Sequence, residues 1–473
     1  MNQRREFLRN TLSLAVGAAA VSSLPGCVFE SDQEPQSPVA VEPGKPLPWI
    51  NWAGNQHCYP SHRVSPANED ELVAAVKQAK GVIRPVGSGH SFSPVVPTDD
   101  TLLSTDLLSG VVAHDPEKLQ AEVLSGTRIH NLGPMLHALG QAMPNLLDMD
   151  YPSLGGAIAN ACHGTGSNFG CMSDYVVGLK LVTPAGELLE CSAEKNSEIF
   201  HAAKTSVGAL GVIASMVIQN QAPFELTEVN RIERTEDVLD DLDNRFARHR
   251  HFEFLPLPHT ELCITMTTDL AKPGDVDQGE DDPMAVNQIK DAFDATSWVP
   301  FFGSRIYEGL INGQLQDSLG EVVRSGPSYR VLPHVRIVRF REMEYTVPVE
   351  VGPKCLREIL ALVKSKNLPM PFPIEYRHVK ADDIWLSMYQ GQAGAAISIH
   401  QFGDRDYKAL FAEIEPIFWK YHGRPHWGKL HTLNAKGLAP LYPKHWQDFQ
   451  EVRRSLDPSG KMLNEHIRNI FVA

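Results

Sequence analysis

The chain has 473 residues, of which 42% are hydrophobic and 21% charged, and its formal net charge is -14 at pH 7. This length exceeds one ordinary core and predicts two domains, while the acidic balance argues against general binding of nucleic acid. No apolar run reaches the ~20 residues that a membrane-spanning helix needs, so the composition favours a soluble protein with a small-molecule partner.

The first 27 residues have the pattern of an export signal. Arg4 and Arg5 precede a short apolar stretch, 12–24, that is rich in Ala, Ser and Gly, as in a twin-arginine signal peptide. Leu24-Pro25-Gly26-Cys27 then resembles a lipobox, in which Cys27 would carry a lipid anchor; cleavage without lipidation is the alternative. We therefore expect export by the twin-arginine pathway, to the periplasm or to the membrane as a lipoprotein.

Residues 28–49 are rich in proline and acidic residues and show almost no periodicity, which predicts a solvated linker. The twin-arginine route carries folded proteins, so the signal also favours an enzyme that acquires a cofactor in the cytoplasm. Six cysteines besides Cys27 would then fold in a reducing compartment, and we expect buried thiols rather than disulfides.

The segment 50–222 is predicted to form one α+β unit. Asn68 caps an expected helix that buries Leu72, Val73, Val76 and Ala79, and Glu71 completes a capping box. A strand through Val82 and Ile83 follows. The remaining expected elements are strands at 119–124, 176–182, 188–191 and 212–218, a helix that ends near 140, and a helix over 198–204.

The segment 223–473 is predicted to be a second domain, without internal repeats. It contains an acidic, glycine-containing loop over 272–283. Alternation and amphipathic spacing then predict strands at 337–347, 374–379 and 395–402, and helices at 353–366, 406–421 and 442–456.

Two glycine-rich loops lie in the first domain, at 85–91 and 154–166. The first, with Gly87 and Gly89, lacks the third glycine and the helix of a nucleotide-binding β-α-β motif and the lysine of an NTPase phosphate loop. Exposed backbone N–H groups in such turns bind phosphate oxygens, so two loops together suggest a long anionic ligand such as a dinucleotide. The alternative for each loop is an ordinary glycine-rich turn.

Several motifs together resemble a known family of flavoproteins. They are Pro85-Val86-Gly87-Ser88-Gly89-His90-Ser91-Phe92, the segments 174–182 and 208–213, and, in the second half, 340–345, 424–429 and 456–461. Over about 55–471 the chain resembles the vanillyl-alcohol-oxidase-type (PCMH) superfamily, specifically the D-arabinono-1,4-lactone, L-gulonolactone and alditol oxidases. The resemblance implies an α+β protein with a PCMH-type FAD-binding domain and a C-terminal α+β substrate domain, divided at 222/223.

The resemblance implies that FAD is bound covalently, through a bond from His90 to the flavin 8α-methyl. A neutral imidazole is a good nucleophile, and once alkylated it withdraws electron density and raises the flavin's reduction potential. The alternative is a loop histidine beside non-covalent FAD. The implied cofactor-binding residues are Pro85, Gly87, Ser88, Gly89, His90, Ser91, Ser153, Gly155, Gly156, Asn160, His163, Gly164, Gly211 and Ile213.

Glu375 and Arg377 alternate on one expected strand, so both side chains face the same side. A carboxylate beside a guanidinium suits a polyol, and the resemblance places the pair near flavin N5. Lys429 would stabilise charge on the reduced ring or polarise the reacting hydroxyl, and His400 would contact substrate. The alternatives are a structural ion pair, an exposed lysine and a core histidine.

The resemblance predicts an FAD-dependent oxidase that moves hydride from a CH–OH group of an aldonolactone or alditol to flavin N5, with O2 as acceptor. Cys162, where relatives often carry Thr or Ala, leaves oxygen reactivity open, so a dehydrogenase with another acceptor is the first alternative. The second is a non-catalytic exported sugar-binding lipoprotein. A zinc hydrolase on His422, His426 and His431 is disfavoured by intervening Gly and Pro, and we expect no metal.

Overall fold

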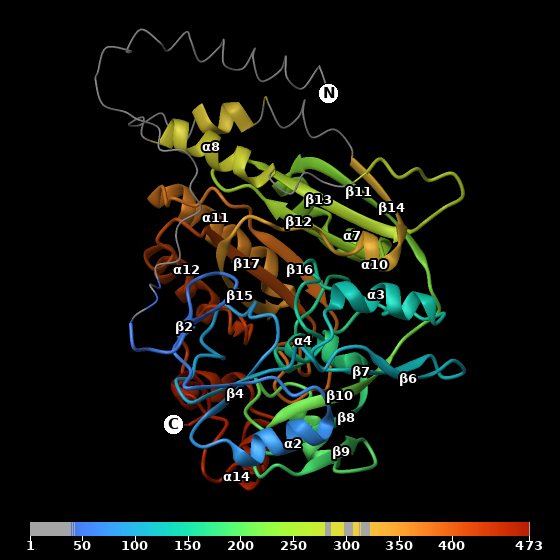
Figure 1. Ribbon diagram of the computed structural model, residues 1–473. Helices are drawn as coiled ribbons and strands as arrows, with labels where there is room; N and C mark the ends of the chain where they lie inside the picture. Colours follow the sequence, from blue (N-terminus) through green and yellow to red (C-terminus); the bar gives the residue numbers. More distant parts are fainter. Residues whose placement is uncertain are drawn as a thin grey trace. The chain divides into compact units, whose positions relative to one another are not determined.

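A computed structural model of the protein describes residues 39, 41, 43–279, 285–297, 306–311, 313 and 322–472. The chain separates into the units Met1–Ala40 and Val41–Ala473, and the fold below is that of the second unit (Figure 1). The predicted signal segment, Cys27, most of the linker and positions 280–283 of the acidic loop lie outside the described residues. In the described part, no helix combines the length and the apolar character needed to cross a bilayer.

The described first half of this unit carries three sheets: a two-stranded antiparallel one of β1 and β2, a parallel one of order β3-β5-β4 and an antiparallel one of order β6-β7-β10-β8-β9. Helix α2 begins as predicted, because the Asn68 side chain accepts a hydrogen bond from the Glu71 N–H, and it buries Leu72 and Val76. The bounds of the elements are β1 Trp49–Ile50, β2 His57–Cys58, β3 His62–Val64, α2 Glu69–Gln78, β4 Ile83–Val86, β5 Thr101–Ser104, β6 Val111–Asp115, β7 Gln120–Leu124, α3 Ile129–Ala138, α4 Leu154–Ala159, β8 Val176–Val182, β9 Leu188–Ser192, α5 Ser197–Ala203 and β10 Val212–Gln219.

The second half is built on an antiparallel sheet of order β14-β11-β13-β12-β16-β17-β15-β18. Helices α11 and α12 pack on it, and Leu356, Ile359 and Val363 of α11 are fully buried against β15, β16 and β17. The bounds are β11 Glu225–Arg234, α6 Thr235–Asp240, α7 Leu242–Arg248, β12 His251–Pro256, β13 Leu262–Leu270, α8 Ala285–Ser297, β14 Val322–Pro327, α10 Ser328–Val331, β15 Phe340–Pro348, α11 Gly352–Lys366, β16 Glu375–Val379, β17 Gly394–Phe402, α12 Lys408–Lys420 and β18 Arg424–Pro425.

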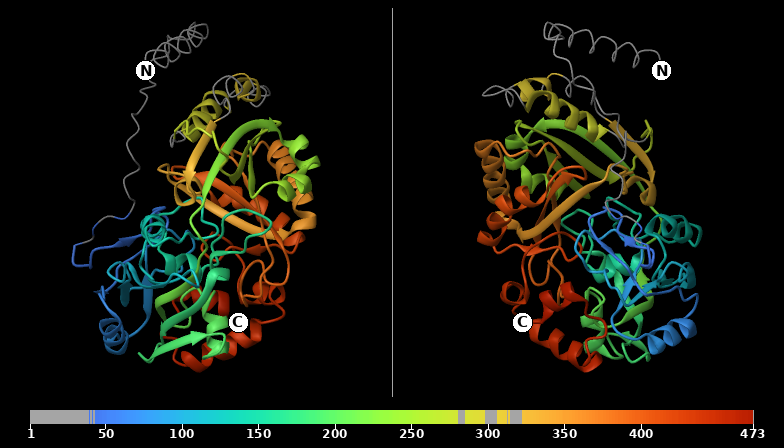
Figure 2. Two further views of the ribbon diagram at one scale, coloured as in Figure 1. Left: turned by 90° about the vertical axis from the view of Figure 1, so that its right-hand side faces the viewer. Right: turned by 60° about the vertical axis from the view of Figure 1, so that its left-hand side comes forward.

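The last helices leave this sheet and return to the first half of the chain, as the red ribbon beside the green strands shows in Figure 2. They are α13 Ala435–Leu438, α14 Trp446–Leu456 and α15 Glu465–Phe471. Trp446, Phe449 and Phe471 share one core with residues of β8, α5 and β10, and the Ile83 N–H donates to the Lys461 carbonyl at 2.8 Å. The predicted division at 222/223 had grouped these helices with the second domain.

Two further expectations meet the structure here. The helix expected over 442–456 begins only at Trp446, because Pro443 and the turn around it precede the regular hydrogen bonding. The six cysteines of the described part are all free, and five of them are buried, as predicted from folding in a reducing compartment.

Candidate active site

A cavity of about 1500 Å³, including its open mouth, is lined by both halves of the chain. The glycine-rich loop after β4 forms one side together with the second glycine-rich segment, whose first part is the short helix α4 rather than a loop, and strands β15, β16 and β17 form the other side. Of the predicted site residues, the cavity wall contains Pro85, Gly87, Ser88, Gly89, His90, Ser91, Ser153, Gly155, Gly156, Asn160, His163, Gly211, Ile213, Glu375, Arg377, His400 and Lys429.

The glycine-rich side offers donors to an anionic ligand. Within the described part of the chain, the backbone N–H groups of Ser88 to Ser91 find no hydrogen-bond acceptor. Gly89 has a φ of +68°, so successive N–H groups turn toward a common point, as in an anion-binding nest. Ser125 Oγ and Asn160 Oδ1 are buried in the same wall and have no partner in this part of the chain. These groups fit the diphosphate and polar ring edges of FAD.

Glycines bring the loops of this side close together. A Cβ on Gly155 would lie 2.8 Å from the Ser125 Cβ, and one on Gly87 would lie 2.7 Å from the Ser153 Cβ. Gly164 is the one predicted residue outside the cavity wall. Its added Cβ would lie 2.1 Å from the Leu146 carbonyl oxygen, so Gly164 supports the segment 145–149 from behind.

His90 lies in the wall between Trp52 and Tyr151, with ring centroids 5.2 Å and 6.3 Å away. Burial, and to a smaller extent Arg128 and Lys429, lowers the pKa of His90 to about 4. The imidazole is therefore neutral near pH 7, which is the form that acts as a nucleophile.

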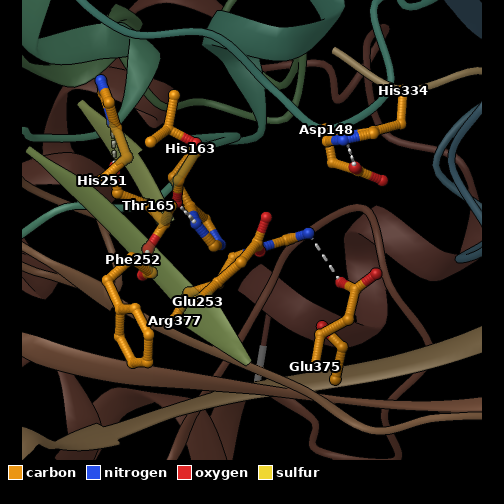
Figure 3. Close-up of polar contacts among 12 residues, drawn as sticks. Asp148, His163, Thr165, His251, Phe252, Glu253, His334, Glu375 and Arg377 are labelled. Atoms are coloured by element: carbon orange, nitrogen blue, oxygen red, sulfur yellow. Dashed lines mark hydrogen bonds and ion pairs between the residues drawn. The ribbon is translucent and has the colours of Figure 1, made fainter. Parts of the chain in front are cut away.

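Glu375 and Arg377 point to one side of β16, as their alternation predicts, and their side chains meet (Figure 3). Arg377 Nη2 lies 3.0 Å from Glu375 Oε2, and Arg377 Nε donates to Glu253 of β12. Burial raises the pKa of Glu375, and the negative charges of Asp148 and Glu342 add to this effect against the opposing pull of Arg377 and His400. Glu375 is thus the site carboxylate that binds a proton most readily.

Lys429 and His400 converge on Glu342 of β15. Lys429 Nζ donates to Glu342 Oε2, and His400 Nε2 lies 3.6 Å from the other oxygen. Burial alone would raise the pKa of Glu342, but Lys429 and His400 outweigh it and lower it to about 2. His400 Nδ1 lies 3.1 Å from the Pro373 carbonyl, so both ring nitrogens face acceptors and the imidazolium form is favoured.

A second buried group consists of His163, Glu344 and His426. His163 Nε2 donates to Glu344 Oε1 at 2.7 Å, and the Ser398 hydroxyl donates to Glu344 Oε2 at 2.8 Å. Among the described residues, ligand-type side chains gather in this group and in Glu342, Glu375 and His400; His422 and His431 are in neither. The histidine triplet considered for zinc is therefore not assembled.

Sequence reasoning missed three acidic residues of the wall: Glu342, Glu344 and Asp148. Glu342 and Glu344 alternate on a predicted strand, so strand alternation places both side chains on one face, as it does for Glu375 and Arg377. Asp148 lies in a loop with no comparable pattern. The half-buried Cys162 also lines the cavity, and removal of its thiol from water raises its pKa to about 12, so it stays protonated.

Comparisons with known proteins agree with this geometry. The family model of D-arabinono-1,4-lactone oxidase matches residues 216–470, and that of an FAD binding domain matches residues 60–192. L-gulono-1,4-lactone dehydrogenase of Mycobacterium tuberculosis is 34% identical over 89% of this chain and 99% of its own length. L-gulonolactone oxidase of Bos taurus is 29% identical over 90% of this chain and 99% of its own.

Among solved structures, cholesterol oxidase of Brevibacterium sterolicum shares the fold, with a TM-score of 0.74 at 15% identity over 92% of this chain and 99% of that chain. The α+β, two-domain PCMH-type FAD-binding fold predicted from the motifs is thereby confirmed. This chain is an FAD-dependent oxidoreductase and belongs to the D-arabinono-1,4-lactone oxidase family.

Proposed function

We propose that this enzyme oxidises a CH–OH group of a sugar lactone. The observation that carries the proposal is the row of charged groups, Lys429, Glu342, His400, Glu375 and Arg377, on the wall of the cavity that also contains the anion-binding nest. Carboxylates accept from hydroxyls and Arg and Lys donate to them, so the row matches a neutral ligand with several hydroxyl groups. The lactones in the names of the relatives are ligands of this kind.

FAD bound in this cavity would take up the hydrogen and the two electrons that leave the substrate carbon. The chain itself would hold the substrate and accept the hydroxyl proton. Glu375 is the best proton acceptor, because its raised pKa lies nearest neutrality, whereas Glu342 is held ionised by Lys429. Arg377 and Lys429 would orient the remaining oxygens as donors.

The purified enzyme, mixed anaerobically with L-gulono-1,4-lactone, D-arabinono-1,4-lactone or a C5 or C6 alditol, tests the proposal. We expect the lactones to bleach the flavin absorbance and the alditols to react at least tenfold more slowly. Bleaching by alditols alone would reject lactones as the substrate class.

The electron acceptor is proposed to be O2, with H2O2 as product. A dehydrogenase is the second candidate, because the mycobacterial relative is named as one and because Cys162, the departure from the family pattern, lines the cavity. Turnover under air with peroxide detection, compared with turnover with dichlorophenolindophenol under argon, separates the two. Rapid dye reduction without peroxide would establish the dehydrogenase.

The covalent bond to His90 is also proposed, on the grounds of its position in the wall and its neutral imidazole. Acid precipitation should leave yellow flavin on the wild-type pellet and release it from His90→Ala. His130→Ala is the control, since His130 is exposed and lies outside the cavity wall. Flavin that remains fixed in His90→Ala would assign the bond to another residue.

Export is proposed on the twin-arginine motif at Arg4 and Arg5, with a lipid on Cys27 as the anchor. Mass spectrometry of the mature N-terminus checks the lipid; an unmodified mature N-terminus would reject it.

A further inference from the structure

We propose that Asp148 binds a hydroxyl group of the substrate and so selects which lactones this enzyme accepts. The inference rests on the proposed lactone oxidation and adds a residue to it. Asp148 lines the cavity between Leu147 and Met149, which line it as well. Figure 3 shows its carboxyl group turned toward the space beside Arg377 and Glu375.

The carboxylate of Asp148 is held through one oxygen only. Oδ1 accepts from His334 Nδ1 at 2.8 Å and from Arg336 Nη2 at 3.1 Å. Within the described residues, neither these nor any other hydrogen bond uses Oδ2. A carboxylate of the cavity wall that is anchored at one oxygen, with no hydrogen bond at the other, is ready to accept one from a ligand.

The anchor itself is buried and fixed. The His334 backbone N–H donates to the Asp148 carbonyl at 2.7 Å, so backbone and side chain tie the same two residues. His334 Nε2 in turn lies 3.0 Å from Glu228 Oε1, and the His334 and Glu228 side chains are only 2% and 4% exposed. Burial would lower the pKa of His334, but Glu228 and Asp148 raise it to about 9, which makes it a cation near pH 7.

The position of Asp148 in the row of charges gives it a different task from Glu375. Asp148 is influenced by Arg336, His334 and Arg377, whereas Lys429 and His400 gather around Glu342. Glu375 lies between these two groups, because both Asp148 and Glu342 act on it. These cations hold the pKa of Asp148 well below its ordinary value, so it accepts hydrogen bonds without taking up the proton. A hydroxyl remote from the reacting carbon is the group that it can bind.

Binding of deoxygenated lactones tests this assignment. L-gulono-1,4-lactone and each of its single-deoxy analogues are titrated anaerobically by calorimetry into the dithionite-reduced enzyme, in which no turnover occurs. A hydrogen bond to a charged group is worth about tenfold to a hundredfold in affinity. The wild type should bind one of the analogues more weakly than the parent lactone by this factor. Asp148→Asn should bind the parent lactone more weakly by the same factor, and it should bind that analogue and the parent lactone with equal affinity.

Asp150→Asn is the matched control, because Asp150 belongs to the same loop, pairs with exposed His130 at 2.9 Å and does not line the cavity. It should bind all the lactones as wild type does. If Asp148→Asn fails to fold for lack of a partner for His334, Asp148→Glu keeps the charge and shifts the oxygen by one methylene, and it should show the same loss.

Two results would overturn the assignment: an unchanged affinity of the Asp148 variant for the parent lactone, or a further loss on deoxygenation as large as in wild type. Either result leaves the lactone oxidation intact, because wild-type flavin is still bleached by lactone. Failure of any lactone to bleach wild-type flavin would instead reject the proposed function.

Discussion

The carboxylates in this cavity have similar chemistry but different proton affinities, and their neighbours explain the difference. Glu342 faces Lys429 and His400, and its pKa falls to about 2. Glu375 is buried with two other carboxylates in range, and its pKa rises above the usual value near 4.5. A site with one fixed charge and one adjustable charge can both hold a hydroxyl and receive its proton.

This difference in pKa predicts that the rate of substrate oxidation has an acid limb in its pH profile. Glu375 must be ionised to accept a proton, so substrate oxidation should slow as the pH falls through its raised pKa. Glu375→Gln should slow anaerobic flavin reduction about a hundredfold and remove this limb, because general-base contributions are typically of that size. Stopped-flow reduction from pH 4.5 to 8 measures both effects, with Glu236→Gln as a surface control. A wild-type rate in Glu375→Gln would identify the pair with Arg377 as structural only.

Among the single residues of the site, those whose position follows from a local sequence pattern could be predicted from the sequence. Glu375 and Arg377 were placed on one face because strand alternation is a local property of the sequence. Asp148 could not be placed, since its partners His334 and Arg336 lie almost 190 positions away and only the fold brings them to it.

Among the elements, helix α11 and the hairpin of β8 and β9 match their predicted positions closely. Buried residues recur at helical spacing in α11, and Pro184-Ala185-Gly186 marks the turn of the hairpin. Strands β11 and β13 had no prediction. The sequence of β11, Glu225–Arg234, carries several polar and charged residues, and its partners on both sides are far along the chain. Non-local pairing, rather than propensity, forms these strands.

The close approach of α4 to the chain after β7 predicts a cofactor-binding defect. Gly155→Ala places a methyl group 2.8 Å from the Ser125 Cβ and 3.0 Å from its carbonyl, so one loop must move away from the other. We expect a folded protein with less than half of the wild-type FAD content, read from the absorbance ratio after gel filtration. Gly178→Ala on β8 is the control, because its nearest neighbour would lie 3.7 Å away. Full FAD content in Gly155→Ala would show that the loops can separate without loss of the site.

His334, in the segment after α10, is a titratable cation that pairs with Glu228 of β11. The pKa of His334 is about 9 in the fold, compared with 6.5 in an unfolded chain. A raised pKa means that the stabilisation is complete below about pH 6.5 and is lost as the pH rises through 9, by about 3 kcal/mol in all. The difference in unfolding free energy between wild type and His334→Gln should therefore shrink from pH 6 to 9.5. His431→Gln is the control, as burial lowers the pKa of His431 to about 4 and it stays neutral throughout. A constant difference for His334→Gln would show that this histidine is not a cation.

At the scale of the whole molecule, the site is closed by parts of the chain that are made last. The Phe92 N–H donates to the Gly428 carbonyl at 2.7 Å, and Arg84 donates to the Met462 carbonyl. The core of the first half is completed by α14 and α15. The division into 50–222 and 223–473 was drawn between sheets, whereas one hydrophobic core joins the strands of the first part to the last helices of the second.

Because the cavity wall includes residues from early and late in the chain, we expect the cofactor to bind only once both have folded, and this bears on the proposed export. The six described cysteines are free thiols, so folding needs no oxidising compartment. The proposed export would have to carry a folded, FAD-loaded enzyme, and the twin-arginine route is proposed for it because Arg4 and Arg5 match that motif.

Exchange of Arg4 and Arg5 for Lys should retain the protein in the cytoplasm as active, yellow holoenzyme, because lysine keeps the charge but not the guanidinium geometry that the export receptor reads. Cell fractionation followed by flavin absorbance and anaerobic bleaching measures location and folding together. Arg9→Lys, outside the pair, should be exported as wild type is. Holoenzyme of the double variant found outside the cytoplasm would rule out the twin-arginine route. Accumulation of unfolded protein inside would show that the substitution acts on folding instead.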